Sequence, residues 1–392
     1  MRSLLSAFFL SLIVTTWQPH GHAFAQDEAI ASFETRAPHA ILIDVDARTT
    51  LFEKAAREPM KPASMAKVLT LAVIFDAMAN GEITPETRFE ITEDAWRRGG
   101  APSRGSTMFA EIHSEVAVAD LIKGIAVHSA NDAAIAVAQG MSGSEEAFAK
   151  RMNTFGQKIG MTGSNFKNAT GLPDPDQFST ARDLAVLTLH VVENYPEQSR
   201  VFAQEDFTWN DIFQRSRNPL LRLDIGADGI KTGYTRESGY GMIASATQGD
   251  RRLIAVVNGL EKAKTREEEA QSILEWGFAS FQTVPLFARS EILGQAQVFG
   301  GSQGYVDVAP RESVTVLLPR GDYGRISAWV EYRGPLRAPV EKGVEVGDLV
   351  VRVDGQERKR QKVYATSDVG TGTMPQRALD ALYELTLGQL GL

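Results

Sequence analysis

Two stretches of the chain, far apart in sequence, alternate apolar and polar side chains as β-strands do. Residues 39–54 predict a strand, a turn at Asp46-Ala47-Arg48 and a second strand. Residues 229–234, 240–247 and 252–259 predict three successive antiparallel strands. Between the two stretches, apolar residues recur at helical spacing instead. Strands at both ends with helices between them indicate a domain whose sheet pairs its two ends.

The most apolar predicted helix begins after Pro62 and runs to about Ala79, where Asn80-Gly81 ends it. Hydrophobic residues cover nearly all of its circumference, so we expect it to be buried on most sides and to lie at the centre of its domain. Further helices are predicted at residues 118–139, 145–159, 180–194 and 264–281. The predicted fold class is α/β (α+β), with a mainly antiparallel sheet flanked by helices.

The pattern changes after Thr283-Val284-Pro285. Short alternating segments then continue to about Ala365, among them residues 313–318, 326–332 and 349–353, with turn residues between them. Regular short strands of this kind predict a second, smaller domain that is an all-β sandwich.

Both ends of the chain carry segments outside these two domains. Arg2, the apolar run from Leu4 to Val14 and the small residues of Ala23-Phe24-Ala25 are typical of a secretory signal peptide, with a buried N-terminal helix as the alternative. Residues 376–392 place leucines at helical spacing, which suits either a membrane interface or packing on protein. We therefore predict a signal peptide at 1–25, a catalytic domain at 26–282, a β-sandwich at 283–372 and an amphipathic segment at 373–392.

Composition narrows the classes of function. Hydrophobic residues make up 43% of the chain and charged residues 23%, as in an ordinary globular protein. The formal net charge is −8, which disfavours a nucleic-acid partner. The chain has no cysteine, and its six histidines show no His-x-x-x-His spacing. We therefore expect neither a metal site nor a cofactor.

Three short motifs occur in one order. Ser64-Met65-Ala66-Lys67 opens the buried helix, Ser129-Ala130-Asn131 lies among the later helices, and Lys231-Thr232-Gly233 opens a strand. Ser-x-x-Lys, Ser-x-Asn and Lys-Thr-Gly signatures of this kind mark β-lactamases and penicillin-binding proteins. Each motif alone is a weak signal, whereas all three in this order behind a signal peptide form a strong one.

The spacing of the first motif has a chemical reason. Residues three apart share one face of a helix, so the Lys67 amine can reach the Ser64 hydroxyl. A serine hydroxyl becomes a good nucleophile when a neighbouring base takes its proton. Lysine can be that base if burial and a nearby positive charge lower its pKa, and Lys231 is the candidate for that charge. A helix N-terminus would also direct backbone N–H groups at a developing oxyanion.

Longer stretches around the motifs resemble one family. Residues from about 38 to 280 resemble the catalytic domain of the D-alanyl-D-alanine carboxypeptidases, the low-molecular-mass penicillin-binding proteins, and residues 284–373 resemble that family's C-terminal β-sandwich. The resemblance implies a β-lactamase/transpeptidase-like fold for the first domain. The stretches that carry it are residues 62–70, 128–134, 168–172 and 228–235.

The resemblance also implies roles for the motif residues. Ser64 is expected to form the acyl-enzyme, and Lys67 to accept its proton. Ser129 is expected to relay a proton to the departing D-alanine amine. Asn131 is expected to hold the amide of the peptide.

The remaining expected roles concern substrate binding. Lys231, Thr232 and Gly233 of the third motif are expected to bind the terminal carboxylate of the peptide. The N–H group of Tyr234, with that of Ser64, is expected to form the oxyanion hole. Arg217 resembles a substrate-binding arginine that lies upstream of the Lys-Thr-Gly strand, with a spacing that differs by one residue.

The implied substrate is a peptidoglycan stem peptide ending in D-Ala-D-Ala, with β-lactam antibiotics as inhibitors. We expect export to the periplasm, with contact to the inner-membrane surface as an open alternative. A D,D-endopeptidase that cuts crosslinks uses the same motifs and stays an alternative. A class A β-lactamase would need a glutamate to activate the deacylating water, and residues 163–172, where it would lie, contain no acidic residue.

Overall fold

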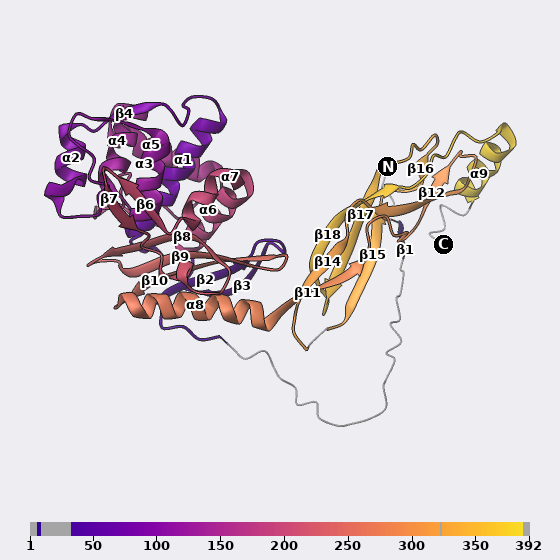
Figure 1. Ribbon diagram of the computed structural model, residues 1–392. Helices are drawn as coiled ribbons and strands as arrows, with labels where there is room; N and C mark the ends of the chain where they lie inside the picture. The colour runs from indigo at the N-terminus through magenta and orange to yellow at the C-terminus, as the bar shows by residue number, and fades with distance from the viewer. Residues whose placement is uncertain (1–5, 9–32, 322–323, 387–392) are drawn as a thin grey trace, which may run out of the picture. The chain divides into compact units, whose positions relative to one another are not determined.

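The computed structural model of the protein describes residues 6–8, 33–321 and 324–386 (Figure 1). The chain divides into two compact units. Ser32–Ala279 forms the first, and Ser280–Leu392 forms the second together with the short strand β1 (Ser6–Phe8). Apart from those three residues, the predicted signal peptide lies outside the described part of the chain, so its export function stays a prediction.

A five-stranded antiparallel sheet organises the first unit. Its strand order is β3-β2-β10-β9-β8, so strands from the beginning of the unit lie beside strands from its end. The register of β2 and β10 pairs Ile41 with Val256. The expected pairing of the two ends of the domain is confirmed. The strands are β2 (His39–Asp44), β3 (Thr49–Lys54), β8 (Ala227–Thr235), β9 (Gly239–Gln248) and β10 (Arg251–Leu260).

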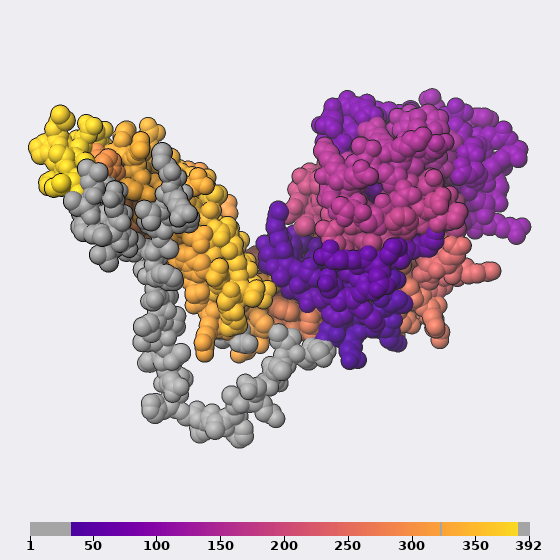
Figure 2. Space-filling view, turned by 180° about the vertical axis from the view of Figure 1, so that it is seen from behind, coloured from indigo at the N-terminus to yellow at the C-terminus, as the bar shows by residue number. Residues whose placement is uncertain are grey.

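Successive side chains along these strands point to opposite faces of the sheet, and both faces are apolar. Leu42 and Ala255 belong to the core between the sheet and α8 (Ala263–Ser280), whereas Ile41 and Val256 belong to the larger core beneath the other helices. Figure 1 shows α8 along one side of the sheet and the remaining helices of the unit on the opposite side. In Figure 2 the magenta helical surface lies directly above the indigo surface of the first strands. The sheet is therefore the middle of three layers.

The helix α1 (Lys67–Ala79) runs through the larger core, as its apolar circumference predicts. Ten of its residues are buried, and Asn80 caps its end. Around it lie α4 (Asn131–Ser142), α5 (Glu145–Lys158) and α6 (Ala181–Asn194). Shorter helical pieces are α2 (Glu93–Gly99), η2 (Ala101–Ser103), α7 (Pro196–Ser199), η4 (Arg200–Ala203) and η5 (Pro219–Arg222).

The single helix predicted over residues 118–139 is wrong, because the chain breaks it in the middle. α3 (Val118–Lys123) continues into a wider π-helical turn, η3 (Gly124–His128), and Ser129 then takes a left-handed conformation with φ of 66°. The Asn131 N–H leaves the helical path and donates to Ser106 O at 2.8 Å. Four of the five residues 128–132 are polar, and this interruption of the apolar run was a signal of the break that the prediction of a single helix overlooked.

Two small two-stranded sheets were not predicted from the sequence. They are β4 (Arg88–Glu90) with β5 (Glu115–Ala117), and β6 (Asp206–Trp209) with β7 (Ile212–Arg215). The strands are three or four residues long, too short for an alternating pattern to identify them.

The second unit is an all-β domain, as the sequence predicts. One sheet has the order β1-β15-β17-β18-β13-β12-β16, and β11 pairs with β14 separately. Apolar side chains from both sheets, among them Val316 and Val351, share one core. The strands are β11 (Phe281–Phe287), β12 (Gly294–Phe299), β13 (Tyr305–Pro310), β14 (Val314–Pro319), β15 (Ile326–Tyr332), β16 (Leu336–Arg337), β17 (Glu345–Val353) and β18 (Gln356–Ala365).

The last described element is α9 (Met374–Thr386), within the segment predicted to be helical. Asp380 Oδ2 accepts a hydrogen bond from Gly300 N at 2.8 Å, which ties the helix to the β-domain. Met374, Leu379 and Leu382 remain 78%, 66% and 60% exposed. Within the described residues, no helix combines the length and the apolar character needed to cross a membrane.

Candidate active site

The first motif lies where the chain enters the buried helix. Ser64 is half-buried in the single turn η1 (Ala63–Ala66), and Lys67 follows as the first residue of α1. Lys67 is completely buried. Its Nζ lies 3.2 Å from Ser64 Oγ, so the three-residue spacing brings the amine and the hydroxyl into hydrogen-bond contact.

Two further oxygens surround the Lys67 amine. Nζ donates to Asn131 Oδ1 at 2.7 Å and to the backbone oxygen of Thr170 at 2.5 Å. Both oxygens can only accept hydrogen bonds. An uncharged amine has two hydrogens and one lone pair. If the hydrogens go to these two acceptors, the lone pair is left facing the Ser64 hydroxyl.

The surroundings of Lys67 favour the uncharged form. Burial, followed by the positive charge of Arg217, lowers the pKa of Lys67 from 10.5 to about 7. The carboxylates of Glu145 and Asp132 raise the pKa of Lys67 and so partly oppose this shift. At neutral pH a substantial fraction of the protein therefore carries a free amine beside Ser64.

The second motif lies at the break between η3 and α4. Ser129 is 2% exposed, and its Oγ has no hydrogen-bond partner among the described residues. Asn131 begins α4, and its side chain reaches Lys67. The left-handed turn at Ser129 thus gives the site a buried hydroxyl that is available to another group.

The third motif lies on β8, beside the turn that carries Ser64. A Cβ on Gly233 would lie 3.0 Å from Pro62 O, so glycine allows the strand to approach η1 closely. Lys231 is 2% exposed and donates to Thr232 O at 3.2 Å. Burial, then the charges of Lys67 and Arg217, holds the pKa of Lys231 well below its usual range.

The last two residues of the sequence prediction lie further along the same region. Tyr234 follows Gly233 on β8, is 53% exposed and stacks on Tyr240 with ring centroids 4.1 Å apart. Arg217 Nε donates to His128 O at 3.2 Å, directly before Ser129. The guanidinium group of Arg217 thus lies close enough to the two buried lysines for its charge to act on both.

Two groups near the Lys67 amine were not predicted from the sequence. One is the Thr170 carbonyl, which is a backbone group and has no residue-type signal. The other is Asp132, whose buried carboxylate accepts hydrogen bonds from Thr107 Oγ1 at 2.6 Å and Met108 N at 3.0 Å. Burial raises the pKa of Asp132. An acidic residue inside the apolar run after Asn131 was a signal that could have identified it.

The described residues contain no cluster of three histidine, aspartate or glutamate side chains suited to hold a metal ion. The site instead consists of two buried lysines, two serines and an asparagine.

Comparison with known proteins places the chain in a family. The family described as D-alanyl-D-alanine carboxypeptidase matches residues 24–262, and the family described as penicillin-binding protein 5, C-terminal domain, matches residues 281–371. The D-alanyl-D-alanine carboxypeptidase DacC of Escherichia coli K12 is 35% identical over 361 residues, which is 91% of this chain and 90% of that protein.

Solved structures agree with the sequence comparison. Penicillin-binding protein 5 from Haemophilus influenzae is similar with a TM-score of 0.77 and 33% identity, over 87% of this chain and 99% of that one. Penicillin-binding protein D2 from Listeria monocytogenes, in its ampicillin-bound form, is similar with a TM-score of 0.55 and 27% identity, over 63% of this chain and 99% of that one. The chain therefore belongs to the D-alanyl-D-alanine carboxypeptidase family of serine hydrolases.

Proposed function

We propose that this protein removes the terminal D-alanine from peptidoglycan stem peptides through an acyl-enzyme on Ser64. The observation that carries the proposal is the buried Lys67 amine, 3.2 Å from Ser64 Oγ, with a pKa of about 7. A base is most effective when its pKa lies near the working pH. Membership of the carboxypeptidase family supports the choice of substrate.

In the acylation step, Ser64 Oγ attacks the carbonyl carbon of the penultimate D-alanine while its proton passes to Lys67. The carbonyl oxygen becomes an oxyanion, for which the N–H groups of Ser64 and Tyr234 are the donors. The peptide C–N bond then breaks, and the departing D-alanine amine receives a proton through Ser129. The unpartnered Oγ of Ser129 supports this role, because a relay must be free to bond the substrate.

In the deacylation step, water attacks the ester carbon and gives its proton to Lys67. The bond to Ser64 Oγ breaks, and the proton returns to that oxygen. The shortened peptide leaves with a free carboxylate. Asn131 Oδ1 accepts from the Lys67 amine, and the proposed further role of the Asn131 side chain is to hold the peptide amide.

Lys231 and Arg217 are explained by the terminal carboxylate of the substrate, which they would bind. Lys231 lies on a strand beside the nucleophile, and Arg217 lies close enough for its charge to act on Lys231. Thr232 offers a hydroxyl next to Lys231, and Gly233 lets the strand approach Ser64. A terminal carboxylate bound here would place the adjacent peptide bond at the nucleophile. Its negative charge would also favour the protonated form of Lys231 and compensate the charge of Arg217.

The same site can also explain penicillin binding, which is a property of this family. A β-lactam presents a carboxylate and a strained amide, so it can occupy the same site and acylate Ser64. The relative from Listeria monocytogenes has been solved with ampicillin bound. A β-lactamase role is disfavoured, because residues 163–172, where the glutamate that activates the deacylating water would lie, contain no acidic residue.

We also propose that the exported protein works in the periplasm with α9 against the inner-membrane surface. The helix presents exposed Met374, Leu379 and Leu382, as an interfacial helix does. In Figure 2 its yellow surface forms a knob at one end of the β-domain. Residues 376–392 carry Arg377 against Asp380 and Glu384, so attachment would depend on apolar burial and not on anionic lipid.

Covalent labelling tests the nucleophile. The purified protein is expected to be labelled by fluorescent penicillin, and Ser64→Ala to abolish the label because the attacking oxygen is gone. The melting temperature of the variant serves as the folding control. Labelling of a folded Ser64→Ala protein would refute the assignment of Ser64.

Product analysis tests the reaction. Incubation with a peptide ending in D-Ala-D-Ala is expected to release free D-alanine, because the site provides cations for one terminal carboxylate. Free D-alanine is measured with D-amino-acid oxidase, and purified crosslinked muropeptides are digested in parallel. Cleavage of the crosslinked muropeptides without D-alanine release would identify a D,D-endopeptidase instead.

Fractionation tests the membrane contact. Deleting residues 373–392 is expected to move the protein from the membrane to the soluble fraction, because it removes the exposed apolar face of α9. Penicillin labelling of the truncated protein is the control for an intact catalytic unit. An unchanged distribution between the fractions would exclude α9 as the attachment.

A further inference from the structure

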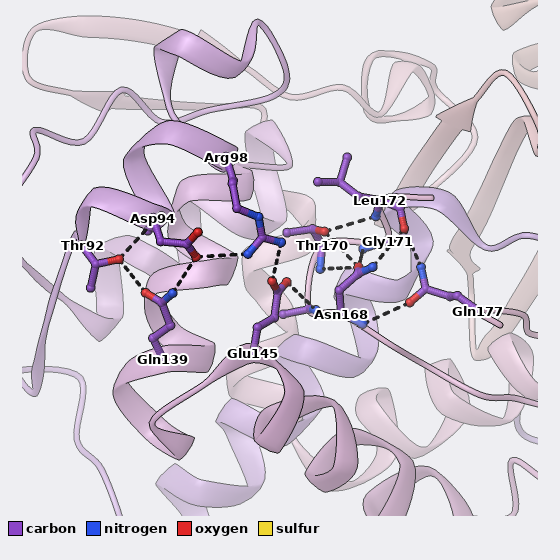
Figure 3. Close-up of polar contacts among 12 residues, drawn as sticks. Thr92, Asp94, Arg98, Gln139, Glu145, Asn168, Thr170, Gly171, Leu172 and Gln177 are labelled. Atoms are coloured by element: carbon purple, nitrogen blue, oxygen red, sulfur yellow. Dashed lines mark hydrogen bonds and ion pairs between the residues drawn. The ribbon is translucent and has the colours of Figure 1, made fainter. Parts of the chain in front are cut away.

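The segment that gives Lys67 its backbone acceptor is tied to a carboxylate on another helix. Thr170 O, which receives one N–H of the amine, lies in residues 168–172. The N–H of the preceding residue, Ala169, donates to Glu145 Oε1 at 3.1 Å. Glu145 is the first residue of α5. Figure 3 shows Glu145 beside Asn168 and Thr170 of this segment, with Arg98 on its other side.

Glu145 is itself held from the opposite side. Its Oε2 accepts a hydrogen bond from Arg98 Nη2 at 2.7 Å, and Arg98 Nη1 lies 3.1 Å from Asp94 Oδ2. Gln139 donates to the same Asp94 oxygen at 2.8 Å and accepts from Thr92 Oγ1 at 2.7 Å. The Glu145 side chain is 10% exposed, against 47% for Arg98. A polar network centred on α2 therefore joins Gln139 of α4 and Glu145 of α5 (Figure 3).

The segment beyond Ala169 is stiff, so a displacement at that residue would move its neighbours. Asn168 Oδ1 accepts hydrogen bonds from Thr170 N at 3.2 Å and Gly171 N at 2.8 Å. Gly171 has φ of 79°, and a Cβ on it would lie only 1.9 Å from Ala63 O. The turn thus packs directly against the residue before Ser64. The same turn therefore contacts the residue before the nucleophile and holds the amine of the base.

We propose that Glu145 is a positioning residue for the base, because through the Ala169 N–H it places the Thr170 oxygen that holds the Lys67 amine. The inference rests on the proposed role of Lys67 as the proton acceptor. Glu145 does not touch substrate in this scheme. It acts through the backbone of residues 169 and 170.

The charge of Glu145 should affect the pH dependence of kcat/KM, which a purely structural role of this residue would leave unchanged. The charged groups facing Lys67 are Lys231 on β8, Arg217 after β7, Asp132 on α4 and Glu145 on α5. Burial and Arg217 lower the pKa of Lys67, whereas Glu145 raises it. Without the Glu145 charge, Lys67 loses its proton at a lower pH. Since the amine is the active form, the acidic limb of kcat/KM must then move to lower pH.

The pH profile of kcat/KM for D-alanine release therefore tests the inference. Glu145→Gln keeps an oxygen for the Ala169 N–H but removes the charge. We expect it to move the acidic limb down by about half a pH unit and to leave the plateau nearly unchanged. Glu145→Ala also removes the acceptor, and we expect a plateau roughly tenfold lower because the amine is no longer held in place.

Glu146→Gln is the matched control. It removes the same charge one residue further along α5, where the side chain is 81% exposed and paired with Lys150. We expect its profile to equal that of the wild type.

A folded Glu145→Ala protein whose plateau equals that of Glu145→Gln would overturn the positioning role, because only Glu145→Ala removes the acceptor of the Ala169 N–H. If Glu145→Ala fails to fold, a Glu145→Gln plateau as low as that of an inactive protein would overturn it instead, and an acidic limb in Glu145→Gln that coincides with the control would overturn the effect of the charge. If the wild-type protein is not acylated at Ser64, the proposed function is wrong and not only the role of Glu145.

Discussion

The active site depends on burying a lysine amine in contact with a serine hydroxyl. Burial and the charge of Arg217 lower the pKa of Lys67 to about 7, while Asn131 Oδ1 and Thr170 O receive the hydrogens of the amine. These constraints together make the lone pair available and aim it at Ser64. The other parts of the unit can be understood by how they maintain this contact. α1 holds the lysine in the core, the break at Ser129 brings Asn131 into place, and residues 168–172 provide the second acceptor.

Burying Lys67 lowers the free energy of unfolding of the protein, but it gives the site an amine that can act as a base. A pKa lowered from 10.5 to about 7 corresponds to roughly 5 kcal/mol against the ammonium form of Lys67. Between these pH values the unfolded chain binds more protons at Lys67 than the folded protein does. The contribution of this lysine to the free energy of unfolding therefore becomes more unfavourable as the pH falls from 10.5 to about 7. The extensive apolar core around α1 can offset that loss, and substrate binding can offset the charges of Lys231 and Arg217.

Much of this could be predicted from the sequence, and the remainder has a physical explanation. The strands, α1 and the β-domain follow from side-chain periodicity, and the Ser64–Lys67 contact follows from the helical repeat. The break at Ser129 was not predicted, although the polar residues within 128–132 interrupt the apolar run there. The Thr170 carbonyl is a backbone group, and Glu145 reaches the site through the Ala169 N–H. Such contacts depend on tertiary placement, which residue types and local spacing do not determine.

The ionisation of Lys67 in the folded protein is the most direct test of this account. Lysine side chains labelled with carbon-13 can be titrated by NMR from about pH 5 to about pH 11, a range that spans shifted and ordinary lysines. Comparison with Lys67→Met assigns the signal. The account predicts a Lys67 resonance with a midpoint near 7. A midpoint near the ordinary 10.5 would mean that Lys67 is an ammonium ion at neutral pH, which would contradict its role as the base.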